Sequence, residues 1–280
     1  MQFFFLLLVV LSLSSSHKFV AFAQEDGSAE EEGHSSILLE SVINNDVDGI
    51  DRALEAQENI DTVNVNGWSA AHFAVNIGSF SMLEAVVNRG IDLNLADETG
   101  YTALMMAASQ SDLEMVELMV GANANPLIAA KNGDTAFSLA HKRHRVGLVI
   151  AEACAVHAIE SSDVPALLTS IENGAYVNIH NAAGWTPLIF ATAMGHEEAV
   201  QFLLRHGAEV DRQENDGWTA LHFAASTGNT RLITLLMQAG ASAGIRAGVQ
   251  GEGLTAKELA KQEGFLEAAE LIPDVVEQEL

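Results

Sequence analysis

The chain has 280 residues, 49 % hydrophobic and 6 % aromatic, which is enough apolar material for a substantial core. Its 38 acidic residues outnumber 13 Lys and Arg and give a formal net charge of -25 at pH 7. Affinity for phosphate backbones and anionic headgroups comes mainly from Lys and Arg, so this charge argues against nucleic-acid binding. It favours a partner with a basic surface, although solubility alone would also account for it.

The first segment predicts a signal peptide. Phe3 to Leu13 form an apolar run too short to span a bilayer, and Ala21-Phe22-Ala23 supplies the small-x-small pattern that places cleavage before Gln24. No Lys or Arg precedes the run, and a plastid presequence is the alternative, but the residues that follow are acidic where a transit peptide is basic. We expect residues 1–23 to be a signal peptide and residues 24–34 an acidic disordered tail.

One eight-residue phrase recurs through the rest of the chain. A representative copy is Gly217-Trp218-Thr219-Ala220-Leu221-His222-Phe223-Ala224. The copies begin at Gly67, Gly100, Gly133, Gly184, Gly217 and Gly253, with spacings of 33, 33, 51, 33 and 36. Glycine tolerates the positive φ of a tight turn, and the Ser or Thr two residues later caps a helix. Pro187 falls at the first helical position, where its missing N–H costs nothing.

Each phrase predicts a pair of helices. The first is short and ends near Gly78, Gly195 or Gly228. Apolar periodicity predicts a second helix, as over 82–88, 113–120 and 197–205. These second helices are expected to stop at Gly90, Gly121, Gly207 and Gly240, each in the position of a C-terminal capping glycine.

This pattern resembles the ankyrin repeat, with its period of 33 and its Thr-Pro-Leu-His-x-Ala helix start. The resemblance covers about residues 35–272. It implies an all-α ankyrin-repeat solenoid of stacked helix-turn-helix units with β-turn fingers. It also implies a structural hydrogen-bonding role for His72 and His222, which keep the family's histidine. The departures at that position are read as Met105, Ser138, Ile189 and Lys257.

The single break in spacing predicts two sub-arrays, residues 35–150 and residues 151–280. Asp46 to Leu54 and Asp163 to Ile171 then read as the outer helices of incomplete repeats that lack a leading turn. Cys154 is the only cysteine and lies in an apolar helical stretch. We expect a buried, inert thiol there, with an intermolecular bridge as the alternative.

No catalytic, metal-binding or cofactor-binding motif occurs in the sequence, so we expect a protein that is not an enzyme and binds neither metal nor cofactor. The run from His141 to Arg145 is the one basic cluster. It is expected to end the inner helix of a degenerate repeat, where cations are favourable. A patch for an acidic partner segment is the alternative.

The candidate partner-binding residues form two groups. The aromatic row contains the residues that follow the repeat glycine, namely Trp68, Tyr101, Trp185 and Trp218. The resemblance places it beside the concave face, where such residues serve either as interface anchors or as packing for the neighbouring turn. The finger residues are Asp97, Glu98, His180, Asn181, Asn215 and Asp216, which vary between copies, although ordinary solvated turns would also vary. The apolar positions Phe73, Met106, Leu139, Phe190, Phe223 and Leu259 are expected to pack between helices.

The resulting hypothesis is a monomeric, non-catalytic protein-binding scaffold in the endoplasmic reticulum lumen or outside the cell, without membrane contact after signal cleavage. A membrane-tethered adaptor that keeps its N-terminal segment is one alternative, and a regulatory or targeting subunit of an enzyme is another. The C-terminal Glu279-Leu280 matches only the end of a retrieval signal. A solvated acidic tail is therefore favoured over retention.

Overall fold

The computed structural model describes residues 36–140, 145–248, 251 and 253–274. The expected signal peptide and the acidic tail, residues 24–34, lie outside the described residues. The chain divides into two compact units with the boundary between Ile150 and Ala151, and each unit is described by itself.

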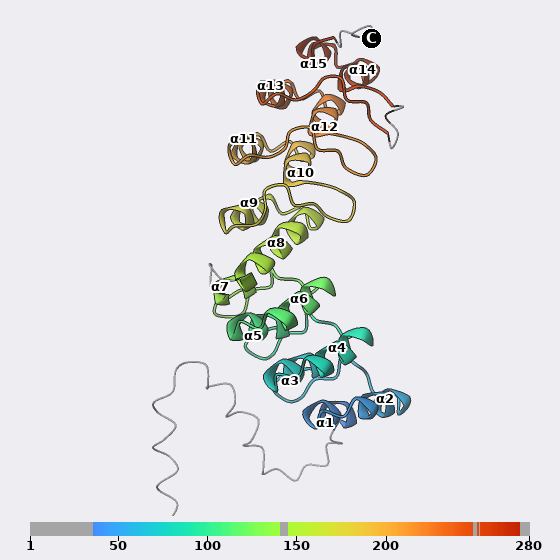
Figure 1. Ribbon diagram of the computed structural model, residues 1–280, viewed down its shortest axis with the longest axis vertical. Helices are drawn as coiled ribbons and strands as arrows, with labels where there is room; N and C mark the ends of the chain where they lie inside the picture. The colour runs from blue at the N-terminus through green and yellow to red at the C-terminus, as the bar shows by residue number, and fades with distance from the viewer. Residues whose placement is uncertain (1–35, 141–144, 249–250, 252, 275–280) are drawn as a thin grey trace, which may run out of the picture. The chain divides into compact units, whose positions relative to one another are not determined.

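The first unit is a stack of antiparallel helix pairs, drawn in blue to green in Figure 1. Its helices are α1 (Ile37–Ile43), α2 (Val47–Glu55), α3 (Ala70–Asn76), α4 (Phe80–Asn88), α5 (Ala103–Gln110), α6 (Leu113–Gly121) and α7 (Ala136–Leu139). Inner helices α1, α3, α5 and α7 each contact the next, and outer helices α2, α4 and α6 do the same. The core lies between the two rows and includes the fully buried Leu38, Ile50, Met82, Leu104 and Met115.

The second unit repeats this arrangement, in yellow to red in Figure 1. Its helices are α9 (Val164–Glu172), α10 (Pro187–Ala193), α11 (Glu197–Arg205), α12 (Ala220–Ser226), α13 (Thr230–Gln238), α14 (Ala256–Gln262) and α15 (Leu266–Leu271). Inner helices α10, α12 and α14 contact one another in order, and outer helices α11, α13 and α15 do likewise. The expected all-α fold of stacked helix pairs is confirmed within each unit.

The two outer helices expected at Asp46 to Leu54 and at Asp163 to Ile171 are present. Helix α2 begins after Asp46, whose carboxylate accepts a hydrogen bond from Gly49 N, and helix α9 begins after Asp163, whose carboxylate accepts one from Ala166 N. A carboxylate at this position satisfies an N–H that the first helical turn leaves unpaired. Outer helices α4 and α6 begin in the same way, after Ser79 and Asp112, so α2 and α9 start like the outer helices of the other repeats.

The expected end of the second helix at Gly121 was wrong. Helix α6 runs through Gly121, and Asn123, at φ +67°, takes the left-handed position that Gly90 holds at φ +80° after α4. Asn123 lies 33 residues after Gly90, and asparagine is the other residue that ends helices in this way. The repeat period, rather than the nearest glycine, thus fixes the helix end.

Inner helix α7 (Ala136–Leu139) ends before the basic cluster. Helix α7 has only four residues, because the chain turns to an extended conformation at Ala140, where ψ is 140°. Arg145 is instead the first residue of α8 (Arg145–Glu160), a 16-residue helix that contains the boundary between the units. The expectation that Arg145 sits at a helix C-terminus was therefore wrong, and residues 141–144 lie outside the described residues.

Candidate functional site

The β-turn fingers project from the helix pairs, and within each unit successive fingers are joined by backbone hydrogen bonds. Each described bridge joins a residue of the finger's first arm to the Ser or Thr that caps the next inner helix, as in Ala96 with Thr102. In the first unit, Glu98 N donates to Asn66 O at 3.1 Å and Lys131 N donates to Thr99 O at 3.0 Å. The second unit has the corresponding bonds from Asn215 N to Ala183 O (3.1 Å) and from Gly248 N to Asp216 O (2.7 Å).

One polar side chain in each finger holds its turn closed. The Asp97 carboxylate accepts from the N–H groups of Thr99 (2.8 Å) and Tyr101 (2.9 Å). The Asn181 side-chain oxygen accepts from Ala183 N (3.1 Å) and Trp185 N (3.0 Å) in the same way. These two predicted binding residues are thus occupied in forming the finger, which leaves them little freedom to contact a partner.

The remaining predicted finger residues lie at the surface. Glu98, His180, Asn215 and Asp216 are all exposed. Asn215 donates from its amide to Ala182 O at 3.0 Å, so it also links two fingers. Within the described residues neither the Glu98 nor the Asp216 carboxylate accepts a hydrogen bond, and both are therefore available to a partner.

In the first unit the aromatic row combines packing with exposure. Trp68 is half-buried, and its ring meets the Phe73 ring edge-on with the centroids 5.3 Å apart. Tyr101 donates its hydroxyl to the Asp134 carboxylate at 2.5 Å, and this bond raises the pKa of Tyr101. Asp134 occupies the row position of its own repeat, so the row here ends in a polar pair.

In the second unit two tryptophans enclose a phenylalanine. Phe223 lies 5.0 Å from Trp185 and 5.1 Å from Trp218 between ring centroids. All three side chains are half-buried, so each keeps part of its ring at the surface. Such amphipathic, rigid surfaces are the kind enriched at interface hot spots, while the ring contacts themselves stabilise the stack.

The histidines implied to be structural form the expected bonds. His72 Nδ1 accepts from Ser69 N at 3.2 Å, so the proton sits on Nε2, which donates to Tyr101 O of the next repeat at 3.0 Å. His222 makes the same pair of bonds, with Thr219 N and with Leu254 O. Burial is the main cause that lowers the pKa of both imidazoles.

The residue at this position in the last repeat is Glu258, not Lys257 as read from the sequence. Glu258 accepts from Thr255 N at 2.8 Å and completes the capping box that histidine completes elsewhere. Lys257 lies one residue too early and instead pairs with Asp274 at 2.7 Å. A count of three residues from the capping threonine would have identified Glu258.

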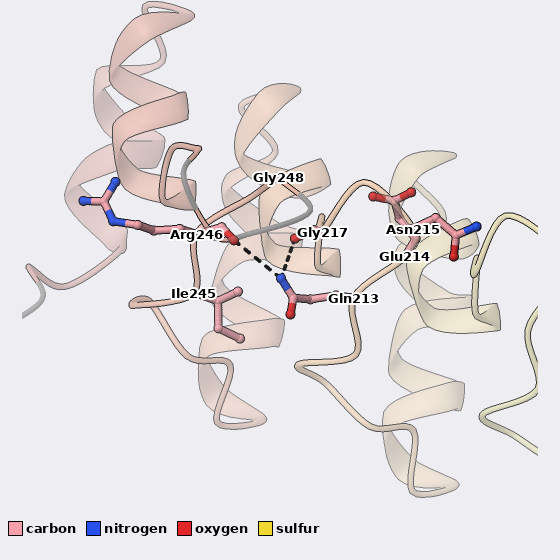
Figure 2. A pocket seen from close by; sticks show the side chains of 8 residues that line it. Gln213, Glu214, Asn215, Gly217, Ile245, Arg246 and Gly248 are labelled. Carbon is pink, nitrogen blue, oxygen red and sulfur yellow. Dashed lines mark hydrogen bonds between the residues drawn. The ribbon is translucent and has the colours of Figure 1, made fainter.

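A hollow of ≈ 550 Å³ lies beside the last two fingers of the second unit (Figure 2). It is lined by Gln213, Glu214, Asn215, Gly217, Ile245, Arg246, Gly248 and Gly251. Gln213 donates to Gly217 O of its own finger at 2.7 Å and to Arg246 O of the next finger at 3.5 Å. The Arg246 side chain extends away from Gln213 to pair with Glu258. Glu214 is buried and accepts from Asp216 N and Trp218 N, so the hollow presents no uncommitted acid or base.

The first two fingers carry acidic side chains without basic ones. Asp61, Asp92, Asp97 and Glu98 belong to them, and the sequence has no Lys or Arg between Arg89 and Lys131. Arg89 itself pairs with Asp51 through both carboxylate oxygens, at 2.7 and 2.8 Å, which lowers the pKa of Asp51. The finger charge is consequently not neutralised from within the repeat.

Sequence reasoning missed a second set of links between repeats. The side chains of Asp61, Asn94, Asn178 and Asp211 each accept a backbone N–H from the following repeat, at 2.7 to 2.8 Å. The signal was present, because Asp61 and Asn94 are 33 residues apart, as are Asn178 and Asp211. These bonds fix the spacing of successive fingers.

Across residues 36–140, 145–248, 251 and 253–274, no group of three or more His, Cys, Asp or Glu is placed to hold a metal ion. In the same residues, no helix has the length and apolar character needed to cross a membrane. Cys154 is buried, and burial raises the pKa of its thiol to about 12.

Comparison with known proteins agrees with the repeat architecture. The family of ankyrin repeats (three copies) matches residues 38–130 and 127–247. Mouse protein phosphatase 1 regulatory subunit 27 is 27 % identical over 99 residues, covering 35 % of this chain and 64 % of that protein. The probable 26S proteasome regulatory subunit p28 of Saccharomyces cerevisiae is 28 % identical over 141 residues, 50 % of this chain and 54 % of that protein.

A third relative, ankyrin repeat and SAM domain-containing protein 6 of Rattus norvegicus, is 31 % identical over 86 residues, which are 30 % of this chain and 10 % of that protein. The chain thus spans less than two thirds of the length of each of these relatives. The family match covers most of the described residues and coincides with the stacked helix pairs and fingers. This chain belongs to the ankyrin-repeat family.

Proposed function

We propose that the chain is a non-catalytic scaffold that binds another protein through its fingers and the adjoining aromatic surface. The observation that carries this proposal is that, within a finger, some residues hold the turn closed and a neighbouring residue is left exposed at the tip. Backbone bonds and one turn side chain hold the finger, as Asp97 does, while the neighbouring tip residue Glu98 is exposed and forms no side-chain bond within the described residues. A rigid frame with freely variable tips suits recognition, because little conformational entropy is lost on binding.

The partner we propose is a protein with a basic surface. The chain has a net charge of -25. In the sequence, the cations that flank the first two fingers are either paired, as Arg89 is with Asp51, or belong to the third finger, as Lys131 does. An unneutralised acidic face steers a cationic partner toward the fingers and disfavours anionic ones. The half-buried Trp68, Trp185 and Trp218 would add apolar contact beside this charge.

The test is capture of partners by chemical crosslinking with three variants of the mature chain. A fingertip variant carries Glu98→Ala and Asp216→Ala, one in each unit, at carboxylates that form no hydrogen bond within the described residues. A matched control carries Glu84→Ala and Glu198→Ala, which remove the same charge from exposed positions on outer helices α4 and α11. A third variant replaces Trp68, Trp185 and Trp218 by Leu.

We expect the control to capture partners as the parent does, and the fingertip variant to lose them although it melts like the parent. The tryptophan variant should also lose partners, measured at a temperature at which it is still folded, because its lost ring contacts lower its melting temperature. Equal capture by all variants would contradict the proposed binding face. Loss of partner capture in the control variant alone would indicate that the partner binds the outer helices instead.

We also propose that the mature chain is monomeric and resides in the endoplasmic reticulum lumen or outside the cell. The support is the sequence alone, with its apolar run from Phe3 to Leu13 and the Ala21-Phe22-Ala23 cleavage pattern. N-terminal sequencing of the expressed protein should begin at Gln24, and light scattering should give the mass of one chain. A retained N-terminus would support the membrane-tethered adaptor instead.

A regulatory or targeting subunit of an enzyme is the second candidate. Two of the relatives carry names of this kind, one for a phosphatase and one for the proteasome. Co-purification of an enzyme whose activity changes when Glu98 and Asp216 are replaced would favour this candidate over a passive scaffold.

A further inference from the structure

The loops that join inner to outer helices in the first unit carry exposed apolar side chains, at the end of each helix pair opposite the fingers. Ile43 ends α1 and is 49 % exposed, and Val47 begins α2 and is 38 % exposed. In the next repeat, Ile77 follows α3 and is 40 % exposed, and Phe80 begins α4 and is 37 % exposed. These four residues form the loop face. The described chain starts at Ser36, at the finger end of α1 and a whole helix length away from this face.

The loops of the first two repeats lie side by side. Ser79, which caps α4, donates from its hydroxyl to the Asn45 side-chain oxygen of the preceding loop at 2.6 Å. Leu113, half-buried at the start of α6, extends the apolar surface into the third repeat, where Gln110 stands in place of Ile77. Contiguous apolar surface of this kind marks interaction sites, whereas exposed apolar residues that are scattered singly are ordinary.

The fold does not require apolar residues at these positions. In the second unit, α11 and α13 begin with Glu197 and Thr230, where α2 and α4 begin with Val47 and Phe80. Both units nonetheless form the same stack of helix pairs. The loop face is therefore a property of the first unit and not of the repeat.

The charge beside the loop face selects its occupant. Asp48 and Glu114, at the second positions of α2 and α6, are exposed, and within the described residues neither carboxylate forms a hydrogen bond or an ion pair. Arg52 is already paired with Asp46, and the sequence has no further Lys or Arg before Arg89. Two copies of this chain would bring acids against acids here, whereas a cationic segment would gain charge complementarity.

The backbone of the loop face favours a helical segment over a strand. Asn45 N, Asp46 N, Gly78 N and Ser79 N each donate to a carbonyl of the preceding helix, so both loops are tight turns. Strand addition needs an extended edge with free backbone groups, which tight turns do not present. A helix satisfies its own backbone bonds and can dock through its side chains alone.

We propose that the loop face binds an amphipathic helix of a partner protein, apolar on one side and flanked there by Lys or Arg. The apolar side of that helix would cover the loop face, and its cations would face Asp48 and Glu114. This surface goes beyond the proposed function, because it lies at the opposite end of the helix pairs from the fingers. It would let the scaffold hold a second protein segment while the fingers are occupied.

The probe is a fluorescein-labelled peptide of about 18 leucine and lysine residues, with leucine at helical spacing. It is titrated with the mature full-length chain in about 150 mM salt, which screens long-range attraction, and followed by anisotropy. A second peptide has the same composition in strict alternation, which is the pattern of a strand rather than a helix.

The apolar test variant is Ile43→Thr with Ile77→Thr. Its matched control is Met194→Thr with Leu266→Thr, at residues of the second unit that are 46 % and 66 % exposed. All variants are compared at a temperature at which each is folded.

The charge test variant is Asp48→Asn with Glu114→Gln. Its matched control is Glu160→Gln with Glu172→Gln, which removes the same charge from exposed positions on α8 and α9.

We expect the apolar variant to weaken binding of the helical peptide by at least about fivefold, because two apolar contacts are lost. The charge variant should weaken it by at least about threefold, and each control by less than about twofold. The alternating peptide should bind at least about tenfold more weakly, because it cannot present one apolar side as a helix.

Equal binding of the helical peptide to the parent and the apolar variant, or equal weakening by the two charge pairs, would overturn the inference and reduce the interaction to general attraction by an acidic protein. Equal binding of the alternating peptide would overturn it as well. Because the loop-face variants leave Glu98 and Asp216 intact, crosslinked capture through the fingers tests the proposed scaffold function separately.

Discussion

The histidine link between repeats allows a prediction that joins stability to pH. His72 is completely buried and joins two repeats, accepting from Ser69 N and donating to Tyr101 O. Replacement by methionine, the residue that the chain itself uses at Met105, keeps most of the volume and removes both bonds. The change leaves the buried Ser69 N–H without its cap and removes one of the two bonds to Tyr101 O, which keeps the bond from Asp97 N. Together these losses should cost about 2–4 kcal/mol of unfolding free energy.

The pH dependence follows from the direction of the pKa shift. Burial lowers the pKa of His72 below its ordinary value of 6.5, against smaller opposing effects of the Tyr101 carbonyl and the Asp97 charge. The unfolded state therefore binds a proton more readily than the folded state. The stability due to His72 is fully present above about pH 6.5, and is lost as the pH falls from there toward the folded pKa, by up to about 1.4 kcal/mol per pH unit.

The assay uses the single tryptophan of the first unit. Trp68 lies 6.3 Å from the His72 ring, so replacing Trp185 and Trp218 by Phe leaves its fluorescence as a reporter of that unit alone. Urea unfolding of this background with and without His72→Met would be compared at pH 7.5, 6.5, 5.5 and 5.0. We expect the difference between the two proteins to be largest at pH 7.5 and to shrink below pH 6.5. A difference that is constant across this range, or below about 0.5 kcal/mol at pH 7.5, would refute the assigned bonds.

Three further predictions concern the repeat glycine Gly217, the capping residue Glu58 and the buried Cys154. Gly217→Ala should lower the unfolding free energy by about 2–4 kcal/mol, and Gly207→Ala by about 1–2 kcal/mol, in thermal or urea unfolding. Both glycines have positive φ, but only at Gly217 would the new Cβ lie 2.6 Å from the Gly248 carbonyl oxygen. Glu58→Gln should raise hydrogen exchange in α1, because the Glu58 carboxylate accepts hydrogen bonds from Ile37 N and Leu38 N at the start of that helix. Burial raises the pKa of Glu58, but these bonds outweigh it and the net pKa is lowered, so in the parent this protection should fade as the carboxylate is protonated in acid. Cys154 should resist Ellman's reagent at pH 8 until denaturant is added, because burial raises its pKa to about 12, and rapid reaction in the folded state would contradict this.

The period of 33 was sufficient to predict the helix pairs and their caps. Each copy must place a small turn residue, a capping hydroxyl and an apolar stripe at fixed positions, so the same residue types recur at the same spacing in the sequence. The exceptions are local substitutions, where Asn123 replaces the expected glycine and Ala140 ends helix α7 after one turn. The stop of α7 depends on the conformation of Ala140, and no residue type in the phrase Gly133 to Ala140 signals it.

The candidate site was less predictable because neighbouring finger residues have different tasks. Asp97 and Glu98 are adjacent acids of one finger, yet one closes the turn and the other is free at the surface. Their roles depend on distance from the repeat glycine, three residues for Asp97 and two for Glu98, a rule that only the geometry reveals. The same rule assigns Asn181 and the buried Glu214 to turn closure.

That rule also explains why the fingers can diversify without loss of the fold. In the first unit the tip residue bonds to the neighbouring finger through its backbone, as Glu98 N does with Asn66 O, so this bond does not depend on which side chain stands at the tip. Positions two residues before the glycine accordingly hold Val65, Glu98 and Lys131 in successive repeats of the first unit. An apolar, an acidic and a basic residue at equivalent, exposed places share no structural requirement. Their variety is therefore free to be set by the partner, and substitutions there should change binding while leaving the unfolding free energy nearly unchanged.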